Sequence, residues 1–226
     1  MIMDNQGEVR DGMRIDWDVP ITMEDGLVLV SKRAMAMQKA CEKTPSTMAA
    51  IIGLDDKIVE DVCSSVNEVV VPANYNSPGQ IVISGHSKAV ERAIGAVKQR
   101  GKKAVLLPVS APFHCALLKP AAERLKEELA KVEVGDLRIP VLSNAEADFY
   151  PGKNKIGELL FKQITHPVRW EECMGQLIRT GVNLVLEVGP GKVLTGLMRR
   201  ISKDLKMANV EDGPSWGKAQ ALLAEN

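Results

Sequence analysis

The stretch MAAIIGLDDKIVEDVCSS, residues 48–65, opens the series of elements that decides the fold: an apolar strand pattern at 48–54, then a helix pattern at 55–64. The same alternation continues with strands at 68–72, 80–84 and 103–107, a turn cluster at 74–79 and a helix at 87–100. This βαββαβ order is that of a ferredoxin-like unit, a four-stranded antiparallel sheet with two helices on one face. We therefore predict a small subdomain over residues 48–107.

A helix is expected before this unit. Thr22 is typical of an N-cap, and Leu27, Val30, Ala34 and Met37 follow it at helical spacing. Arg33 lies within this helix, where an arginine is usually solvated. Residues 1–20 show no sustained periodicity and are predicted to form a loose arm.

Beyond the unit the pattern alternates between helices and strands. It predicts a short strand at 139–142, helices at 156–164 and 170–179, a strand at 184–188 and a helix at 193–201. Because such alternation is typical of parallel sheets, we assign residues 21–47 and 108–226 to a larger α/β subdomain. Only two strands are predicted here, too few for a sheet covered on both faces, so this subdomain looks incomplete.

The composition excludes several classes of function. Lys plus Arg and Asp plus Glu each number 29, and aromatic residues make up 4%. A net charge of zero and few aromatics argue against nucleic acid or a membrane surface as a partner. The 4 cysteines show no CxxC spacing, which predicts reduced thiols and no bound metal. We also expect no resident cofactor. Without a signal peptide or an apolar span in the sequence, we expect a cytoplasmic protein.

The stretch VSAPFHC, residues 109–115, is where we place the chemistry. It lies between a strand pattern and a helix pattern, and such a junction presents side chains at the end of a sheet. His114 can take and return a proton at neutral pH, although a histidine that only packs the helix start is an equal alternative. Cys115 is an alternative nucleophile, disfavoured because adjacent residues at a helix start point in different directions.

Two glycine motifs resemble active-site loops. Gly85-His86-Ser87-Lys88-Ala89 approximates the G-x-S-x-G nucleophile elbow but lacks its second glycine, and Ser87 is better explained as the N-cap of the next helix. Gly189-Pro190-Gly191-Lys192 lacks the spacing of a phosphate-binding loop, so we interpret it as a tight turn. For Asn74, in the turn cluster, turn formation is favoured over a functional role.

Four segments together resemble the malonyl-CoA:acyl carrier protein transacylases of bacterial type II fatty acid synthesis. They are PANYNSPGQIVISGH at 72–86, PVSAPFH at 108–114, QITHPVRW at 163–170 and EVGPGKVL at 187–194. With residues 23–40, the likeness covers nearly all of the chain from Pro20 onward. The resemblance implies a partial α/β-hydrolase-like large subdomain into which the ferredoxin-like small subdomain is inserted.

The resemblance also implies a reaction. In this family a serine attacks the malonyl thioester of malonyl-CoA, a histidine takes its proton, and the acyl group passes to the phosphopantetheine thiol of acyl carrier protein. His114 matches the catalytic histidine, Gln163 the residue whose carbonyl orients it, and Arg33 the arginine that holds the malonyl carboxylate. Phe113 resembles the malonyl-selective pattern, and Asn76 is placed with the substrate-binding residues.

The chain departs from the family pattern at the nucleophile. The G-H-S-x-G elbow should precede the arginine, but no serine occurs before Ser31, and the family's Gly-Gln-Gly segment is also absent. We therefore expect this polypeptide alone to have little or no transacylase activity. The alternatives are a non-catalytic module that binds a carrier protein or a partner chain, with association through an exposed sheet edge, and a truncated gene product.

Overall fold

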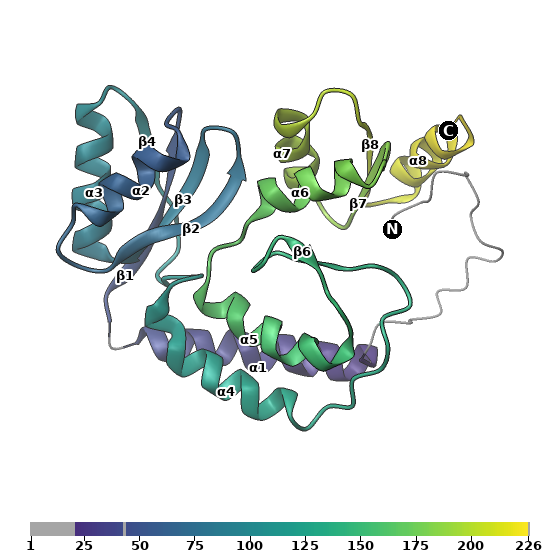
Figure 1. Ribbon diagram of the computed structural model, residues 1–226, viewed down its shortest axis with the longest axis horizontal. Helices are drawn as coiled ribbons and strands as arrows, with labels where there is room; N and C mark the ends of the chain where they lie inside the picture. Colours follow the sequence, from purple (N-terminus) through teal and green to yellow (C-terminus); the bar gives the residue numbers. More distant parts are fainter. Residues whose placement is uncertain (1–20, 43, 226) are drawn as a thin grey trace. The chain divides into compact units, whose positions relative to one another are not determined.

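The computed structural model describes residues 21–42 and 44–225, which form two compact units, one up to residue 170 and one from residue 171 (Figure 1). Both units combine helices with strands, so the predicted mixed α/β character is confirmed. The predicted arm, residues 1–20, lies outside the described residues.

The first unit contains the predicted βαββαβ order. Its elements are β1 Ser46–Ile52, α2 Asp56–Ser64, β2 Val70–Ser77, β3 Gln80–His86, α3 Ser87–Gln99 and β4 Lys103–Leu106. The strands form one antiparallel sheet in the order β2-β3-β1-β4, with Ile51 opposite Ile81 in the register of β1 and β3. The alternate side chains of these strands, Ile83 among them, pack with α2 and α3 in one buried cluster, as period-two strands against amphipathic helices should.

β2 is longer than the sequence pattern indicates. The predicted turn cluster at 74–79 is strand as far as Ser77, and only the next two residues form the turn, with Gly79 at a φ of 69°. Two bulges interrupt the register of β2 with β3, and a bulge breaks the alternation by which a strand is recognised. The prediction of a turn at Asn74 and Asn76 is therefore wrong, because both residues lie in the strand.

β2 also pairs with a segment far along the chain. Val168 forms a parallel bridge with Asn74, in which its N–H donates to the Ala73 carbonyl at 2.8 Å and its carbonyl accepts from the Tyr75 N–H at 2.9 Å. Val168 comes just after α5, Ile156–Thr165, so this bridge ties the end of α5 to the sheet.

Three helices of the first unit pack around a second buried cluster. α1, Met23–Cys41, contacts α4, Lys119–Leu129, and α4 contacts α5. Thr22 caps α1 as predicted, because its Oγ1 accepts the Asp25 N–H at 3.1 Å. The single-turn helix η1, Ala116–Leu118, leads directly into α4.

The segment between α4 and α5 holds little regular structure. It contains β5 Leu142–Ser143 and β6 Asp148–Phe149, which pair with each other, and the short helix η2 Lys153–Lys155. The strand predicted at 139–142 is thus reduced to its last residue. Ile139 is 64% exposed and has no apolar layer against which a strand could bury it.

The second unit begins with α6, Trp170–Arg179, whose first residue lies at the boundary. It contains β7 Leu184–Val188, α7 Val193–Ile201, β8 Lys206–Val210 and α8 Gly213–Ala224. β7 and β8 pair in parallel, and Leu184 and Leu186 pack with α8 through Ala219. The sequence pattern does not predict β8 or α8. β8 is nowhere fully buried and mixes polar with apolar residues, so neither face gives a periodic signal.

Candidate active site

Gln163 has a main-chain carbonyl that its own helix cannot use. A helical carbonyl normally accepts the N–H four residues later, but for Gln163 that residue is Pro167, which has no N–H. The carbonyl oxygen lies instead 2.9 Å from Nδ1 of His114. The sequence Gln-Ile-Thr-His-Pro at the end of α5 therefore leaves an acceptor for a side chain 49 positions away.

This contact fixes the tautomer of His114. A carbonyl oxygen can only accept, so Nδ1 carries the proton and Nε2 is the basic nitrogen of the neutral ring. Burial lowers the pKa of His114 from 6.5, the positive charge of Arg33 lowers it further, and hydrogen bonds to the backbone of Gln163 and His166 oppose the shift. The ring is therefore neutral at pH 7 and ready to accept a proton at Nε2.

The loop that carries His114 is held in a demanding conformation. His114 has a φ of 58°, in the left-handed region that residues with a Cβ rarely adopt. Thr47 Oγ1 donates to the Val109 carbonyl at 3.1 Å, and Ser46 Oγ donates to the Ser110 carbonyl at 3.4 Å. The start of β1 thus anchors the loop, which joins β4 to η1 as the sequence predicts.

Phe113 connects the two parts of the first unit beside His114. It is half-buried and packs against the helix cluster that includes Leu118 and Ile164. It also packs against the sheet cluster that includes Met48 and Val82. A bulky ring in this position fills the space between helices and sheet next to the histidine.

Arg33 is brought to the same glutamine from α1. Its Nη2 donates to Oε1 of Gln163 at 3.0 Å, across 130 positions of sequence. Burial lowers the pKa of Arg33, but a guanidinium stays protonated at neutral pH. Among the described residues Arg33 forms no ion pair, so its charge is uncompensated by a carboxylate. The usual interpretation of a fully solvated arginine is wrong here, since the side chain is half-buried against a neutral partner.

The structure therefore joins three of the predicted site residues. His114 and Arg33 both contact Gln163, one at its main chain and one at its side chain. Asn76 lies half-buried in β2, and among the described residues no hydrogen bond links it to these three. The contact between the Gln163 side chain and Arg33 is not predicted by the sequence, in which the two residues are separated by most of the chain.

The glycine of the elbow-like motif around Ser87 is explained by the packing of two strands. A Cβ on Gly85 would lie 2.1 Å from the Val69 carbonyl oxygen, so the close approach of β2 and β3 requires a glycine there. Ser87 is the first residue of α3, with His86 in the cap position and no side-chain cap bond. The prediction that Ser87 is the N-cap is therefore wrong by one residue.

The Gly-Pro-Gly-Lys turn before α7 is closed by carboxylates of the chain itself. Glu187 accepts the N–H of Leu194 at 3.0 Å through Oε1 and that of Thr195 at 2.7 Å through Oε2. Glu211 accepts the Gly191 N–H at 2.9 Å. These N–H groups are the ones a phosphate would use, so their occupation agrees with the predicted tight turn.

The structure argues against Cys115 as the nucleophile. Cys115 is fully buried, and burial raises the pKa of its thiol. Because the thiolate is the reactive form, a raised pKa makes this sulfur a poor nucleophile at neutral pH. The structure is better explained by Cys115 as a small apolar residue of the core.

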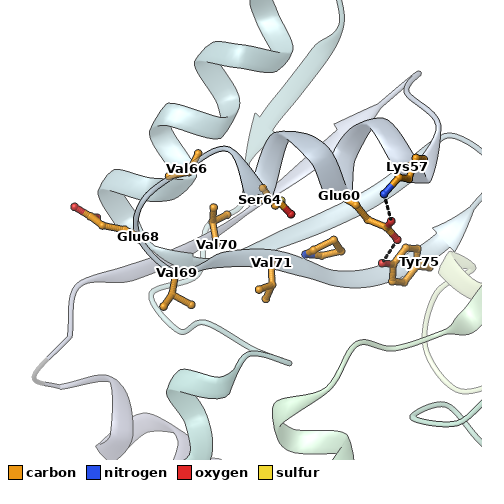
Figure 2. A pocket seen from close by; sticks show the side chains of 11 residues that line it. Lys57, Glu60, Ser64, Val66, Glu68, Val69, Val70, Val71 and Tyr75 are labelled. Carbon is orange, nitrogen blue, oxygen red and sulfur yellow. Dashed lines mark hydrogen bonds and ion pairs between the residues drawn. The ribbon is translucent and has the colours of Figure 1, made fainter.

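A separate hollow of about 570 Å³ lies beside α2 and β2 (Figure 2). The Tyr75 hydroxyl donates to Glu60 at 3.0 Å, and Lys57 pairs with the same carboxylate at 3.9 Å. Burial, with a smaller effect of Glu60, raises the pKa of Cys63 at its wall to about 12. The hollow is lined by none of the predicted site residues.

Within residues 21–42 and 44–225, no group of three or more His, Cys, Asp or Glu side chains is arranged to hold a metal ion. None of the helices described there has the length and the apolar character needed to cross a membrane.

Comparison with known proteins adds sequence and structural relatives. Residues 18–222 match the family model "Acyl transferase domain". The malonyl CoA-acyl carrier protein transacylase of Escherichia coli K12 is 42% identical over 205 residues, which are 89% of this chain and 66% of that protein. The Bacillus subtilis protein of the same name is 43% identical over 211 residues, 91% of this chain and 67% of that one.

The solved structures that resemble this chain carry the same kind of name as its sequence relatives. The malonyl CoA-acyl carrier protein transacylase from Clostridium perfringens superposes with a TM-score of 0.88 at 40% identity, over 91% of this chain and 66% of that one. A malonyl-transacylase in complex with its type II PKS acyl-carrier protein gives 0.87 at 40% identity, over 92% and 68%. The chain spans about two thirds of the length of these relatives. With nearly its whole length matched by the family model and by these relatives, the chain belongs to the acyl transferase domain family.

Proposed function

We propose that this chain takes part in the transfer of a malonyl group from malonyl-CoA to the phosphopantetheine thiol of an acyl carrier protein, through an acyl-serine intermediate. Family membership and the names of its relatives support the reaction class. The observation that carries the proposal is the double contact of Gln163, which holds a neutral, half-buried histidine and an arginine without a carboxylate partner.

His114 is the proposed acid and base. When a serine hydroxyl attacks the thioester carbonyl, Nε2 takes the hydroxyl proton, the C–S bond breaks, and the proton passes to the sulfur of the departing coenzyme A. In the second half-reaction Nε2 takes the proton of the carrier thiol, whose sulfur attacks the serine ester, and returns it to the serine oxygen. The protonated Nδ1, held by the Gln163 carbonyl, orients the ring for both steps.

Arg33 is the proposed carboxylate-binding group. A guanidinium offers a planar pair of donors that matches a carboxylate, and partial burial strengthens the attraction. This contact would favour malonyl over acetyl groups, which lack the second carboxylate. Phe113 would limit the room for a branch on the acyl chain, and Asn76 is assigned to substrate binding by resemblance alone.

The nucleophile is the part of the reaction that this sequence does not supply in the family order. Its first serine, Ser31, lies two positions before Arg33 on α1 rather than in an elbow upstream of it. We propose that the 226-residue polypeptide alone transfers malonyl groups weakly or not at all.

Further parts of the proposal follow from the resemblance. They are a ferredoxin-like small subdomain at 48–107, a larger α/β-hydrolase-like subdomain from 21–47 and 108–226, a cytoplasmic location, and no cofactor besides the coenzyme A of the substrate. The strand order β2-β3-β1-β4 supports the first of these.

A malonyl-transfer assay tests the proposal in two forms of the protein. The chain alone, incubated with malonyl-CoA and holo carrier protein, should give no malonylated protein by intact mass and little transfer. A chimera in which a segment carrying the family's G-H-S-x-G elbow precedes Thr22 should be active. His114→Ala in the chimera should reduce transfer by several orders of magnitude. His86→Ala, a second histidine outside the site, is the matched control and should retain it. Robust turnover by the chain alone, or an active His114→Ala chimera, would contradict the proposal.

One observation favours a second candidate, a partner-binding module. In the described residues β7 pairs only with β8, and Val188 and Val193 at the end of β7 and the start of α7 are 70% and 72% exposed. Two-stranded parallel sheets are normally covered on both faces, so these groups favour association. Size-exclusion chromatography of the chain should show a species larger than a monomer, whereas a clean monomer would count against this candidate.

A further inference from the structure

We propose that the side chain of Gln163 is a positioning residue for the substrate carboxylate, because it holds the Arg33 guanidinium in the orientation that receives the malonyl group. This inference rests on the proposed function and extends it to a second role for Gln163. The first role, orienting His114, belongs to the main-chain carbonyl; the second belongs to the side-chain amide.

The geometry shows why Arg33 needs a partner. It extends from α1, where it lies among exposed residues, and its long side chain would otherwise sample many rotamers. The 3.0 Å bond from Nη2 to Oε1 of Gln163 fixes one edge of the guanidinium. The remaining N–H groups then point in a set direction, so less conformational entropy is lost when a carboxylate binds.

The neutrality of the partner matters as much as its position. A glutamate in place of Gln163 could accept the same hydrogen bond, but its charge would compensate that of Arg33. An amide fixes the guanidinium without neutralising it. Gln163 therefore orients the cation and leaves its charge for the substrate, which suits a site that must release its carboxylate in each cycle.

The two roles of Gln163 can be separated by substitution. Any residue at position 163 keeps the main-chain carbonyl, and the absence of an N–H at Pro167 keeps that carbonyl available to His114. Gln163→Met retains length and shape but removes the acceptor, and Gln163→Glu retains an acceptor but adds a charge. The side chain can thus be tested while the histidine contact is monitored independently.

The chain also offers a matched control. Gln176 on α6 accepts from Nη2 of Arg179 at 2.6 Å and from its Nε at 3.1 Å. The two residues form a second glutamine–arginine pair, in this case within one helix. Neither partner is among the proposed site residues. Gln176→Met removes the same kind of bond without affecting Arg33, so any general effect of losing such a pair appears in this variant.

The experiment is calorimetric titration of the full chain with malonyl-CoA and with acetyl-CoA. The unmodified chain should bind malonyl-CoA more tightly, and Arg33→Met should abolish that preference. Gln163→Met should reduce the preference about tenfold, the low end of the effect of one hydrogen bond to a charged group, with acetyl-CoA binding unchanged. Gln163→Glu should reduce it further, and Gln176→Met should leave it intact. The imidazole nitrogen signals of His114 should keep the Nδ1–H tautomer in both Gln163 variants.

The outcomes distinguish the inference from the function on which it rests. An unmodified chain without a preference for malonyl-CoA, or an Arg33→Met variant that keeps one, would overturn the proposed carboxylate site and the inference with it. If Arg33→Met loses the preference while Gln163→Met keeps it in full, only the positioning role is overturned. A gain of affinity in Gln163→Glu would equally contradict the role of a neutral partner.

Discussion

The loop that carries His114 and the turn that precedes α7 are both polar connections from a strand to a helix, yet they use their hydrogen-bonding groups in opposite ways. In the turn, the N–H groups at the start of α7 are satisfied by Glu187, a residue of the same unit only a few positions away. In the loop, Nδ1 of His114 contacts the Gln163 carbonyl from another element, so that Nε2 is the basic nitrogen of the neutral ring. The comparison shows that a strand-to-helix junction becomes a candidate site only where its polar groups are not already satisfied locally.

The largest effect is expected from removing the carboxylate that closes the turn. Glu187→Ala leaves the N–H groups of Leu194 and Thr195 without acceptors at the helix start, where they also carry the positive end of the dipole. We expect the free energy of unfolding to fall by about 1–2 kcal/mol, a range typical of lost helix caps and already reduced for partial exposure. Urea unfolding followed by circular dichroism measures the change.

The same variant sharpens the comparison because it should affect stability alone. Malonyl-CoA affinity should be unchanged in Glu187→Ala, the reverse of the result expected for Gln163→Met. A variant that lost malonyl-CoA binding while keeping its stability would show that the turn belongs to the site after all.

A smaller effect is expected at the anchor of the histidine loop. Thr47→Val keeps the β-branched shape in β1 but removes the hydroxyl that donates to the Val109 carbonyl. Loss of this bond should cost about 1 kcal/mol and should broaden the His114 signals, because the strained φ of His114 is held less firmly. The measurement combines urea unfolding with imidazole NMR line widths, and unchanged line widths would argue that the loop needs no such anchor.

Because His114 is buried, the free energy of unfolding should depend on pH in the acid range. Its pKa in the folded state lies below the unfolded value of 6.5, so the unfolded state binds more protons as the pH falls below that value. The free energy of unfolding should therefore decrease from pH 6.5 downward, and this contribution should be flat above it. His114→Asn should show a shallower loss of stability in acid than the unmodified chain. Equal slopes in the two proteins would contradict the shifted pKa.

The sequence predicts those parts of the molecule in which local pattern and structure agree. The Thr22 cap, the βαββαβ order and the junction before His114 all follow from periodicity and capping, which depend on neighbours in the chain. The bulged end of β2 and the partly buried β8 were not predictable in this way. Bulges hide the alternation in β2, and β8 is defined by its pairing with β7 rather than by its own residues.

In the site, too, only the features that depend on neighbouring residues can be predicted from the sequence. The proline four residues after Gln163 is visible in the sequence and explains why that carbonyl is available to a side chain. The identity of the side chain that uses it, and the contact between Gln163 and Arg33, depend on how α1 and α5 pack around a common core. Packing at this distance leaves no local signal, so only the resemblance to a family placed these residues together.

The most direct test of the account is an NMR titration of the His114 imidazole nitrogens with pH, in the presence of malonyl-CoA or of acetyl-CoA. We expect the Nδ1–H tautomer and a midpoint below 6.5 in the free chain, because burial and the nearby charge of Arg33 disfavour the protonated ring. Malonyl-CoA should raise the midpoint, because its carboxylate compensates the charge of Arg33, and acetyl-CoA should not. A ring that titrates at its ordinary value with the proton on Nε2, or one that responds equally to both thioesters, would contradict it.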